Sequence, residues 1–138
     1  MTDEELQARV TAFLNEKLSL VRGQWTTALF DHSQDLGLSD RKALFFELLK
    51  RLLEMGEIRF IHPDETENIM WVDGRDPPPK SIHDPTTHWN ESAPNIVSHL
   101  MGHWPSGVED PNSPDLNVYF YRMPPVIWRS DDGDWVGS

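Results

Sequence analysis

Two histidines at helical spacing are the residues that come nearest to forming a metal site. His99 and His103 stand four positions apart in HLMGH, which would place both imidazoles on one face of a helix. Asp84 and His88 lie upstream and could complete a ligand set. However, the stretch lacks the glutamate that serves as base in H-E-x-x-H, and no further ligand follows at fixed spacing. We therefore expect two solvent-facing histidines and no functional metal.

Adjacent carboxylates could in principle support hydrolysis. Three pairs occur along the chain: Asp64 with Glu65, Glu109 with Asp110, and Asp131 with Asp132. Glycosidase or nuclease chemistry requires carboxylates held in a cleft with tuned pKa values, whereas these pairs stand in predicted turns. The chain has no cysteine, no G-x-S-x-G, no P-loop and no dinucleotide fingerprint. The sequence therefore predicts a non-enzymatic protein without a cofactor.

The charge of the chain is its strongest compositional feature. Twelve Lys and Arg stand against 23 Asp and Glu, giving a formal net charge of −11. The excess of acidic residues is concentrated after residue 60, where the chain has 13 acidic and 4 basic residues. Such a field repels nucleic acid, whose binding depends on neutralised phosphates, and attracts cationic partners. We expect a cationic protein partner and no nucleic acid.

Hydropathy and the N-terminus indicate where such a protein would act. Mean hydropathy is −0.55, and no apolar run reaches the roughly 18 residues of a membrane span. The first residues, MTDEELQ, are too acidic and polar for a signal or transit peptide. Together with the absence of cysteine, these features predict a cytoplasmic bacterial protein that does not bind membranes.

Residues 1–60 are predicted to be mainly helical. Thr2 to Glu5 form a capping box ahead of an apolar stripe, and a second short helix over Gln24–His32 would bury Trp25 and Leu29. The third helix is the stretch ALFFELLKRLLEMG. We expect Ser39 and Asp40 to cap its start, Met55 to face inward, and Gly56 to end it.

A β-hairpin is predicted to follow these helices. Ile58–His62 alternates as a strand, residues 63–65 form a turn, and Asn68–Val72 returns as a second strand. Three helices and a hairpin give the order of a winged helix-turn-helix. We do not expect DNA binding, because acidic residues on the third helix nearly cancel its basic ones.

Residues 61–138 are rich in Pro and Trp, and they are predicted to form mainly strands and loops. After the Pro-rich loop 73–87, Ser92–Trp104 is predicted to form a helix. Strands follow at Asn117–Tyr121, Val126–Arg129 and Asp134–Val136, the last two joined by a turn at Asp131–Gly133. The fold class expected for residues 1–138 is therefore a single α+β domain with a C-terminal antiparallel sheet. The alternating aromatics Tyr119, Tyr121, Trp128 and Trp135 should pack against helices.

The chain also resembles a family of small bacterial proteins over roughly residues 40–138. The segments that carry the resemblance are KALFFELLKRLLEMGEIRFI, HWP and DLNVYFYRMPPVIW with DGDWVGS. Members of that family are similar to immunity proteins of polymorphic toxin systems, such as contact-dependent growth inhibition. The Pro-rich middle, DGRDPPPKSIHDPTT, does not match the pattern. The resemblance implies an immunity protein that neutralises a cognate toxin, and it implies no catalytic residues.

The function expected from charge and resemblance together is an immunity protein against a basic toxin domain. An acidic adaptor or regulatory interaction module is the alternative, and an enzyme or metal-binding protein ranks below both. Steering by acidic turns and anchoring by aromatic side chains are the features that such an interface needs. The predicted interface consists of Asp64, Glu65, Glu67, Asp73, Asp76, Glu109, Asp110, Asp131, Asp132 and Asp134, with Trp128 and Trp135 as anchors.

Overall fold

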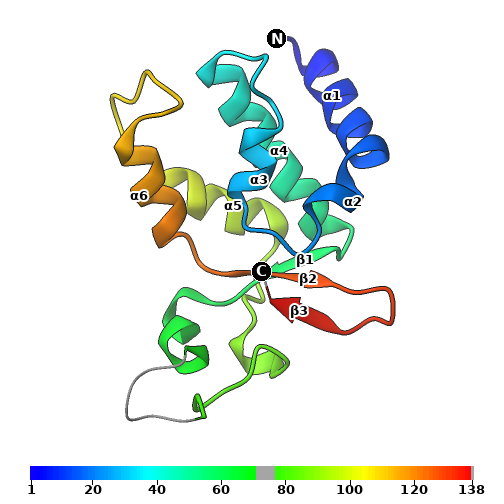
Figure 1. The fold of residues 1–138 in the computed structure, drawn as a ribbon, viewed down its shortest axis with the longest axis vertical. Coiled ribbons are helices and arrows are strands. Elements are labelled where there is room, and N and C mark those ends of the chain that lie inside the picture. Colours follow the sequence, from blue (N-terminus) through cyan, green and yellow to red (C-terminus); the bar gives the residue numbers. More distant parts are fainter. Residues whose placement is uncertain (71–76, 138) are drawn as a thin grey trace.

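The fold is organised around one long helix that other elements surround (Figure 1). The structure is a computed structural model that describes residues 1–70 and 77–137. Helix α4, Leu38–Glu54, buries apolar side chains along most of its length and packs against α1, α3 and α5. It begins at Leu38, with Gly37 as N-cap and no side-chain cap, so the prediction that Ser39 and Asp40 cap it is wrong. Gly37 accepts the first helical bond through its carbonyl, from Arg41 N at 2.9 Å.

Three shorter helices precede α4. Helix α1, Asp3–Glu16, starts as predicted, because the Thr2 side chain accepts a hydrogen bond from Glu5 N. Helices α2, Leu18–Val21, and α3, Thr27–Asp31, follow. The predicted second helix is therefore shorter than expected, and Trp25 lies ahead of it with 54% of its surface exposed. Its predicted burial is wrong, whereas Leu29 is buried as expected.

The described part of the second half contains two α-helices, whereas the sequence predicts one. Helix α5, Ala93–Gly102, confirms the predicted helix, with Ser92 accepting from Asn95 N. Helix α6, Pro114–Arg122, replaces the predicted strand Asn117–Tyr121. Ser113 caps it, Pro114 occupies its first position, and its buried residues recur at helical spacing: Leu116, Tyr119 and Phe120. Burial of that stripe outweighs the strand preference of the aromatic run.

A small antiparallel sheet closes one end of the helical layer. Strands β1, Ile58–Phe60, β2, Val126–Arg129, and β3, Trp135–Gly137, pair in the order β1-β2-β3. The β2–β3 hairpin confirms the predicted C-terminal hairpin, and Gly133 supplies a positive φ of 89° in its turn. The chain thus has the expected α+β class.

The predicted hairpin after the third helix is not present in the described residues. Strand β1 pairs with β2, whose partner residues stand 66 to 70 positions further along the chain. Pro63–Ile69 forms a 3-10 helix, η1, in place of the turn and returning strand. A second 3-10 helix, η2, spans Pro85–Thr87. The chain returns to β1 at Trp89, whose N–H donates to Phe60 O at 2.8 Å. The winged-helix order is therefore wrong, although residues 71–72 of the predicted strand lie outside the described residues.

Aromatic rings join α6 to the helices beneath it. The Phe120 ring lies 5.2 Å from that of Phe30 on α3 and 5.3 Å from that of Phe45 on α4, measured between centroids. Tyr119 contacts Trp104 at 5.2 Å. Such pairs add to the stability that comes from apolar burial itself.

No helix in the described part of the chain is both long and apolar enough to cross a membrane.

Gly56 is predicted to be required at the end of α4. It follows the helix with φ of 73°, and a Cβ there would meet only Arg129 Nη1 at 3.5 Å. The cost of Gly56→Ala should therefore come from the backbone, about 1–2 kcal/mol of unfolding free energy, measured by urea denaturation. Gly102→Ala is the control, because Gly102 lies in α5 without a positive φ or any atom within 4 Å. Equal stability of the two variants would contradict the proposed cause.

Candidate functional site

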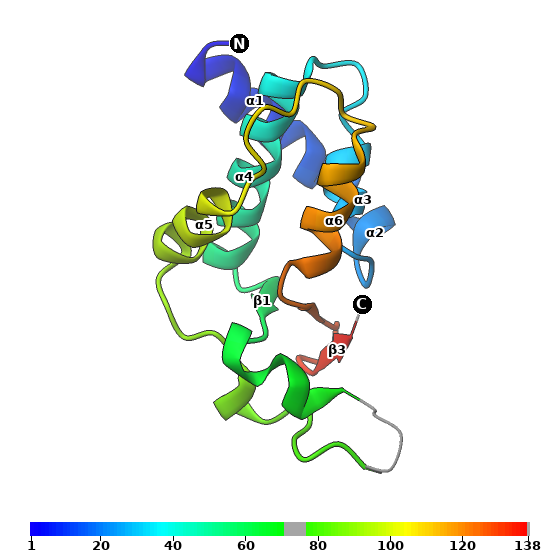
Figure 2. The ribbon, with the colours of Figure 1, turned by 90° about the vertical axis from the view of Figure 1, so that its left-hand side faces the viewer.

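The acidic turns predicted as one interface lie in different parts of the molecule. Asp64, Glu65 and Glu67 belong to η1, and Asp131, Asp132 and Asp134 belong to the β2–β3 turn. Glu109 and Asp110 lie in the loop between α5 and α6, at the opposite end of the long axis from η1 in both views (Figures 1 and 2). Asp73 and Asp76 lie outside the described residues. The structure therefore does not gather the described acids into a single patch.

Several of these carboxylates hold their own segments together. Glu65 accepts hydrogen bonds from Lys80 Nζ at 2.9 Å and from Asn68 Nδ2 at 2.7 Å, and these bonds lower its pKa. Asp132 accepts from the Ser130 hydroxyl and from Asp134 N, which lowers its pKa as well. Both are stable anions with structural partners in the chain.

The two tryptophans predicted as anchors differ in exposure. Trp128 is 1% exposed, and its Nε1 donates to Gln24 O at 2.8 Å, so it is enclosed in the core and offers a partner no surface. Trp135 is half-buried against the guanidinium of Arg59, which lies 4.8 Å from the ring centroid. Of the pair, only Trp135 presents part of its ring to solvent.

His88 is a structural residue in this arrangement. It is 4% exposed, and its Nε2 lies 2.7 Å from Ile82 O while its Nδ1 lies 3.1 Å from Arg59 Nη1. Since Arg59 can only donate and the Ile82 carbonyl can only accept, the ring donates through Nε2 and accepts through Nδ1. His88 thus ties the loop before η2 to β1, and it is not free to bind a metal.

His99 and His103 are exposed on α5, and their ring centroids lie 4.9 Å apart. The shared helix face that their spacing predicts is confirmed. Asp84, one of the other predicted ligands, instead caps η2 by accepting from Thr86 N at 2.9 Å. Within residues 1–70 and 77–137, no three His, Asp or Glu side chains gather closely enough to hold a metal ion.

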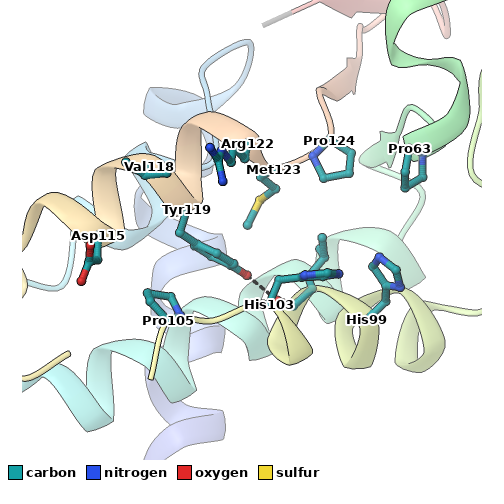
Figure 3. Close-up of a pocket in the computed structure, with 11 residues that line it drawn as sticks. Pro63, His99, His103, Pro105, Asp115, Val118, Tyr119, Arg122, Met123 and Pro124 are labelled. Carbon is teal, nitrogen blue, oxygen red and sulfur yellow. Dashed lines mark hydrogen bonds between the residues drawn. The ribbon is translucent and has the colours of Figure 1, made fainter. Parts of the chain in front are cut away.

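A groove of about 430 Å³ runs between α5 and α6 (Figure 3). Tyr119 crosses its base and donates its hydroxyl proton to Leu100 O at 2.6 Å. Burial raises the pKa of Tyr119 well above its usual value, so this hydroxyl remains a donor. The groove is lined by apolar side chains and by four polar ones: His99, His103, Asp115 and Arg122.

A second, smaller hollow of about 250 Å³ lies where α6 meets the chain before β2. Trp25 and Tyr121 both line it, and they are the two most exposed aromatic side chains of the described residues, at 54% and 77%. Its base is formed by Thr26, Phe120, Met123, Pro124, Pro125 and Val126. We call this hollow the Trp25–Tyr121 pocket.

The sequence interpretation missed both members of this pocket. The sequence places Trp25 in a helix that in fact begins after it, and it places Tyr121 on the core side of a strand that is in fact helix α6. The signal for a helix here is Ser113-Pro114 followed by apolar residues at helical spacing: Leu116, Tyr119 and Phe120. This spacing places Tyr121 on the outer face of the helix.

An acidic turn lies close to the segment that carries Trp25. Arg22 Nη2 pairs with Glu57 at 3.2 Å, and Arg22 Nη1 lies 4.0 Å from Asp131 in the β2–β3 turn. Strand β2 begins at the pocket with Val126 and ends at Arg129, and Asp131 follows two residues later, so the turn starts about 16 Å along the chain from Val126. The acidic turn therefore lies beyond the end of β2 that is far from the pocket.

Comparison with known proteins identifies a similar fold and no function. No protein-family model matches the chain, and no curated protein matches it. A solved structure described as an uncharacterized protein conserved in bacteria, from Neisseria meningitidis, is similar with a TM-score of 0.65. The match covers 97% of this chain and 93% of that one at 16% sequence identity, so it supports the fold alone.

The Glu65–Lys80 pair generates a pH prediction. Because the pKa of Glu65 is lowered in the folded chain, ionised Glu65 stabilises the fold above its unfolded pKa, and this contribution is lost as the pH falls through the folded value. Lys80→Gln should raise the Glu65 pKa towards its usual value, as followed by carboxyl NMR titration. Lys50→Gln, at a lysine without a hydrogen bond to Glu65, should leave it unchanged. A Glu65 pKa that does not respond to Lys80→Gln would contradict the assignment.

Proposed function

We propose that this chain is a non-enzymatic binding protein that neutralises a cationic protein, as an immunity protein against a basic toxin domain in the bacterial cytoplasm. The observation that carries the proposal is the Trp25–Tyr121 pocket in a protein of net charge −11. The family resemblance supplies the specific form of the proposal, a toxin as the partner.

Exposed aromatic rings on one pocket are a strong sign of a protein interface. Trp and Tyr are enriched among residues that contribute most to protein binding, and contiguous apolar surface on a soluble protein usually marks such a site. Trp25 leaves 54% of its surface in water, and Tyr121 leaves 77%. Covering both rings would bury apolar area that the fold itself does not use.

The surrounding charge favours a basic partner. An aromatic face attracts Lys and Arg side chains, and it does so more strongly when water is excluded. The acidic β2–β3 turn, beyond the far end of β2, would add long-range attraction, which speeds the encounter of oppositely charged proteins. Fast association suits an inhibitor that must reach a toxin before the toxin acts.

The carboxylates support binding rather than catalysis. A general acid at neutral pH needs a raised pKa, as burial or a neighbouring like charge provides. The carboxyl groups whose pKa departs from the ordinary value, in the described residues, all have it lowered: Asp35, Glu65, Asp84 and Asp132. They are anions that add to the negative field of the chain, which attracts cations.

The alternative is an acidic adaptor module that binds a regulatory partner through the same pocket. The partner itself separates the two. Affinity purification of the tagged chain from its native lysate, read by mass spectrometry, should recover the C-terminal domain of a large secreted protein encoded beside it. Stoichiometric recovery of a housekeeping protein would instead support the adaptor.

The pocket is expected to dominate affinity for the recovered partner. Trp25→Ala and Tyr121→Ala should each weaken binding by about 2 kcal/mol, or roughly 30-fold, as measured by calorimetry. Met55→Ala is the control, because Met55, whose predicted inward orientation is wrong, is also an exposed apolar side chain, at 48%. It lies at the end of α4, outside the pocket lining. Wild-type affinity in both aromatic variants would place the interface elsewhere.

The acidic β2–β3 turn is expected to govern the association rate. Asp134→Lys should slow association and flatten its dependence on salt while leaving dissociation nearly unchanged. Glu109→Lys makes the same change in charge in the loop between α5 and α6, and should have a smaller effect. Stopped-flow mixing at several salt concentrations measures both, and equal effects would show that only total charge matters.

A further inference from the structure

We propose that the groove between α5 and α6 binds a small anionic molecule with an apolar body. This groove adjoins the Trp25–Tyr121 pocket, with which it shares Met123 and Pro124, but the inference does not depend on the proposed function. Its basis is the combination of groove size, an apolar lining, and cationic or protonatable groups on both walls (Figure 3).

The dimensions suit a small ligand. A volume of about 430 Å³ falls within the range of roughly 300–1,000 Å³ that small-molecule sites occupy. The apolar lining comes from Leu100 on α5, from Val118 and Met123 at α6, and from three prolines that follow or face these helices: Pro63, Pro105 and Pro124. An aliphatic or aromatic body would displace water from these side chains at little cost.

The polar groups favour an anionic head. Arg122 on α6 is exposed and forms no ion pair within residues 1–70 and 77–137. His99 on α5 and His103, the residue that follows α5, stand on the opposite wall. A guanidinium can donate two parallel hydrogen bonds to a carboxylate or phosphate, and an imidazole N–H can donate another. Such a grouping is unexpected in a chain with 23 acidic side chains.

The remaining polar residues define the orientation of the ligand. Asp115, the acid that lines the groove, lies towards one end of it, whereas His99 lies towards the other (Figure 3). An anionic head is therefore repelled from the Asp115 end and attracted towards the histidines. Tyr119 cannot recognise the head, because its hydroxyl already donates to Leu100 O at 2.6 Å. It serves as the rigid base of the groove.

The test uses three ligands that share a ten-carbon chain: decanoate, decyl phosphate and decyltrimethylammonium. Calorimetric titration of the full chain, below the micellar concentration of each ligand, should show one-to-one binding of at least one anion and none of the cation. Comparison of decanoate with decyl phosphate then distinguishes a carboxylate ligand from a phosphate ester. Equal affinity for the cation would overturn the proposal.

Two variants test the assigned roles. Arg122→Gln removes the cation but keeps a side chain of polar character, and it should weaken anion binding about tenfold or more. Arg129→Gln, at an exposed arginine of β2 outside the groove, should leave affinity unchanged. Val118→Asp introduces a carboxylate at a half-exposed position of the groove and should abolish binding while the fold persists. Wild-type affinity in Arg122→Gln, or amide NMR shifts confined to another face, would overturn the site.

Discussion

Burial of α4 is the constraint on which the rest of the structure depends. Its buried side chains point to several sides, so one partner layer cannot cover them, and α1, α3 and α5 all pack against it. Phe45 on α4 also contacts Phe30 and Phe120, which brings α3 and α6 into the same aromatic cluster. The three short strands stabilise one end of this assembly. The fold is therefore a helical core with a small sheet attached.

Local signals in the sequence predict the elements that depend on local physics. The Thr2 capping box, the Ser92 cap of α5 and the Gly133 hairpin turn all occur where short-range hydrogen bonding and backbone sterics require them. Two local predictions fail nonetheless, the Ser39–Asp40 cap of α4 and the strand Asn117–Tyr121, which is helix α6. The failed hairpin prediction concerns long-range pairing. Strand β1 pairs with β2 across more than sixty residues, and no pattern near Ile58 indicates that partner. Pro63 instead starts a 3-10 turn, which removes the neighbouring segment from strand pairing.

In the candidate site, too, local features follow from the sequence, whereas features that depend on tertiary packing do not. Acidic turns are evident in the sequence, but their spatial separation is not, because it depends on where α5, α6 and η1 lie in the fold. Exposure of Trp25 is also a tertiary property. Large aromatic residues are usually buried, and Trp25 remains exposed because α3 begins only at Thr27 and leaves it in the preceding turn. The proposal of a basic partner rests on composition, whereas the surface proposed for that partner emerges only from packing.

Helix α6 connects the core to both candidate binding sites, and its helical form is what makes this possible. In a strand, Tyr119 and Tyr121 would point to the same face, and both would be buried or both exposed. In a helix, side chains two positions apart are rotated by about 200° around the helix axis. Tyr119 therefore faces the core, whereas Tyr121 faces solvent. Met123 and Pro124, just beyond the helix, line both the groove and the Trp25–Tyr121 pocket. A ligand in either proposed site would therefore contact the same two residues, so the end of α6 is where the two sites would influence each other.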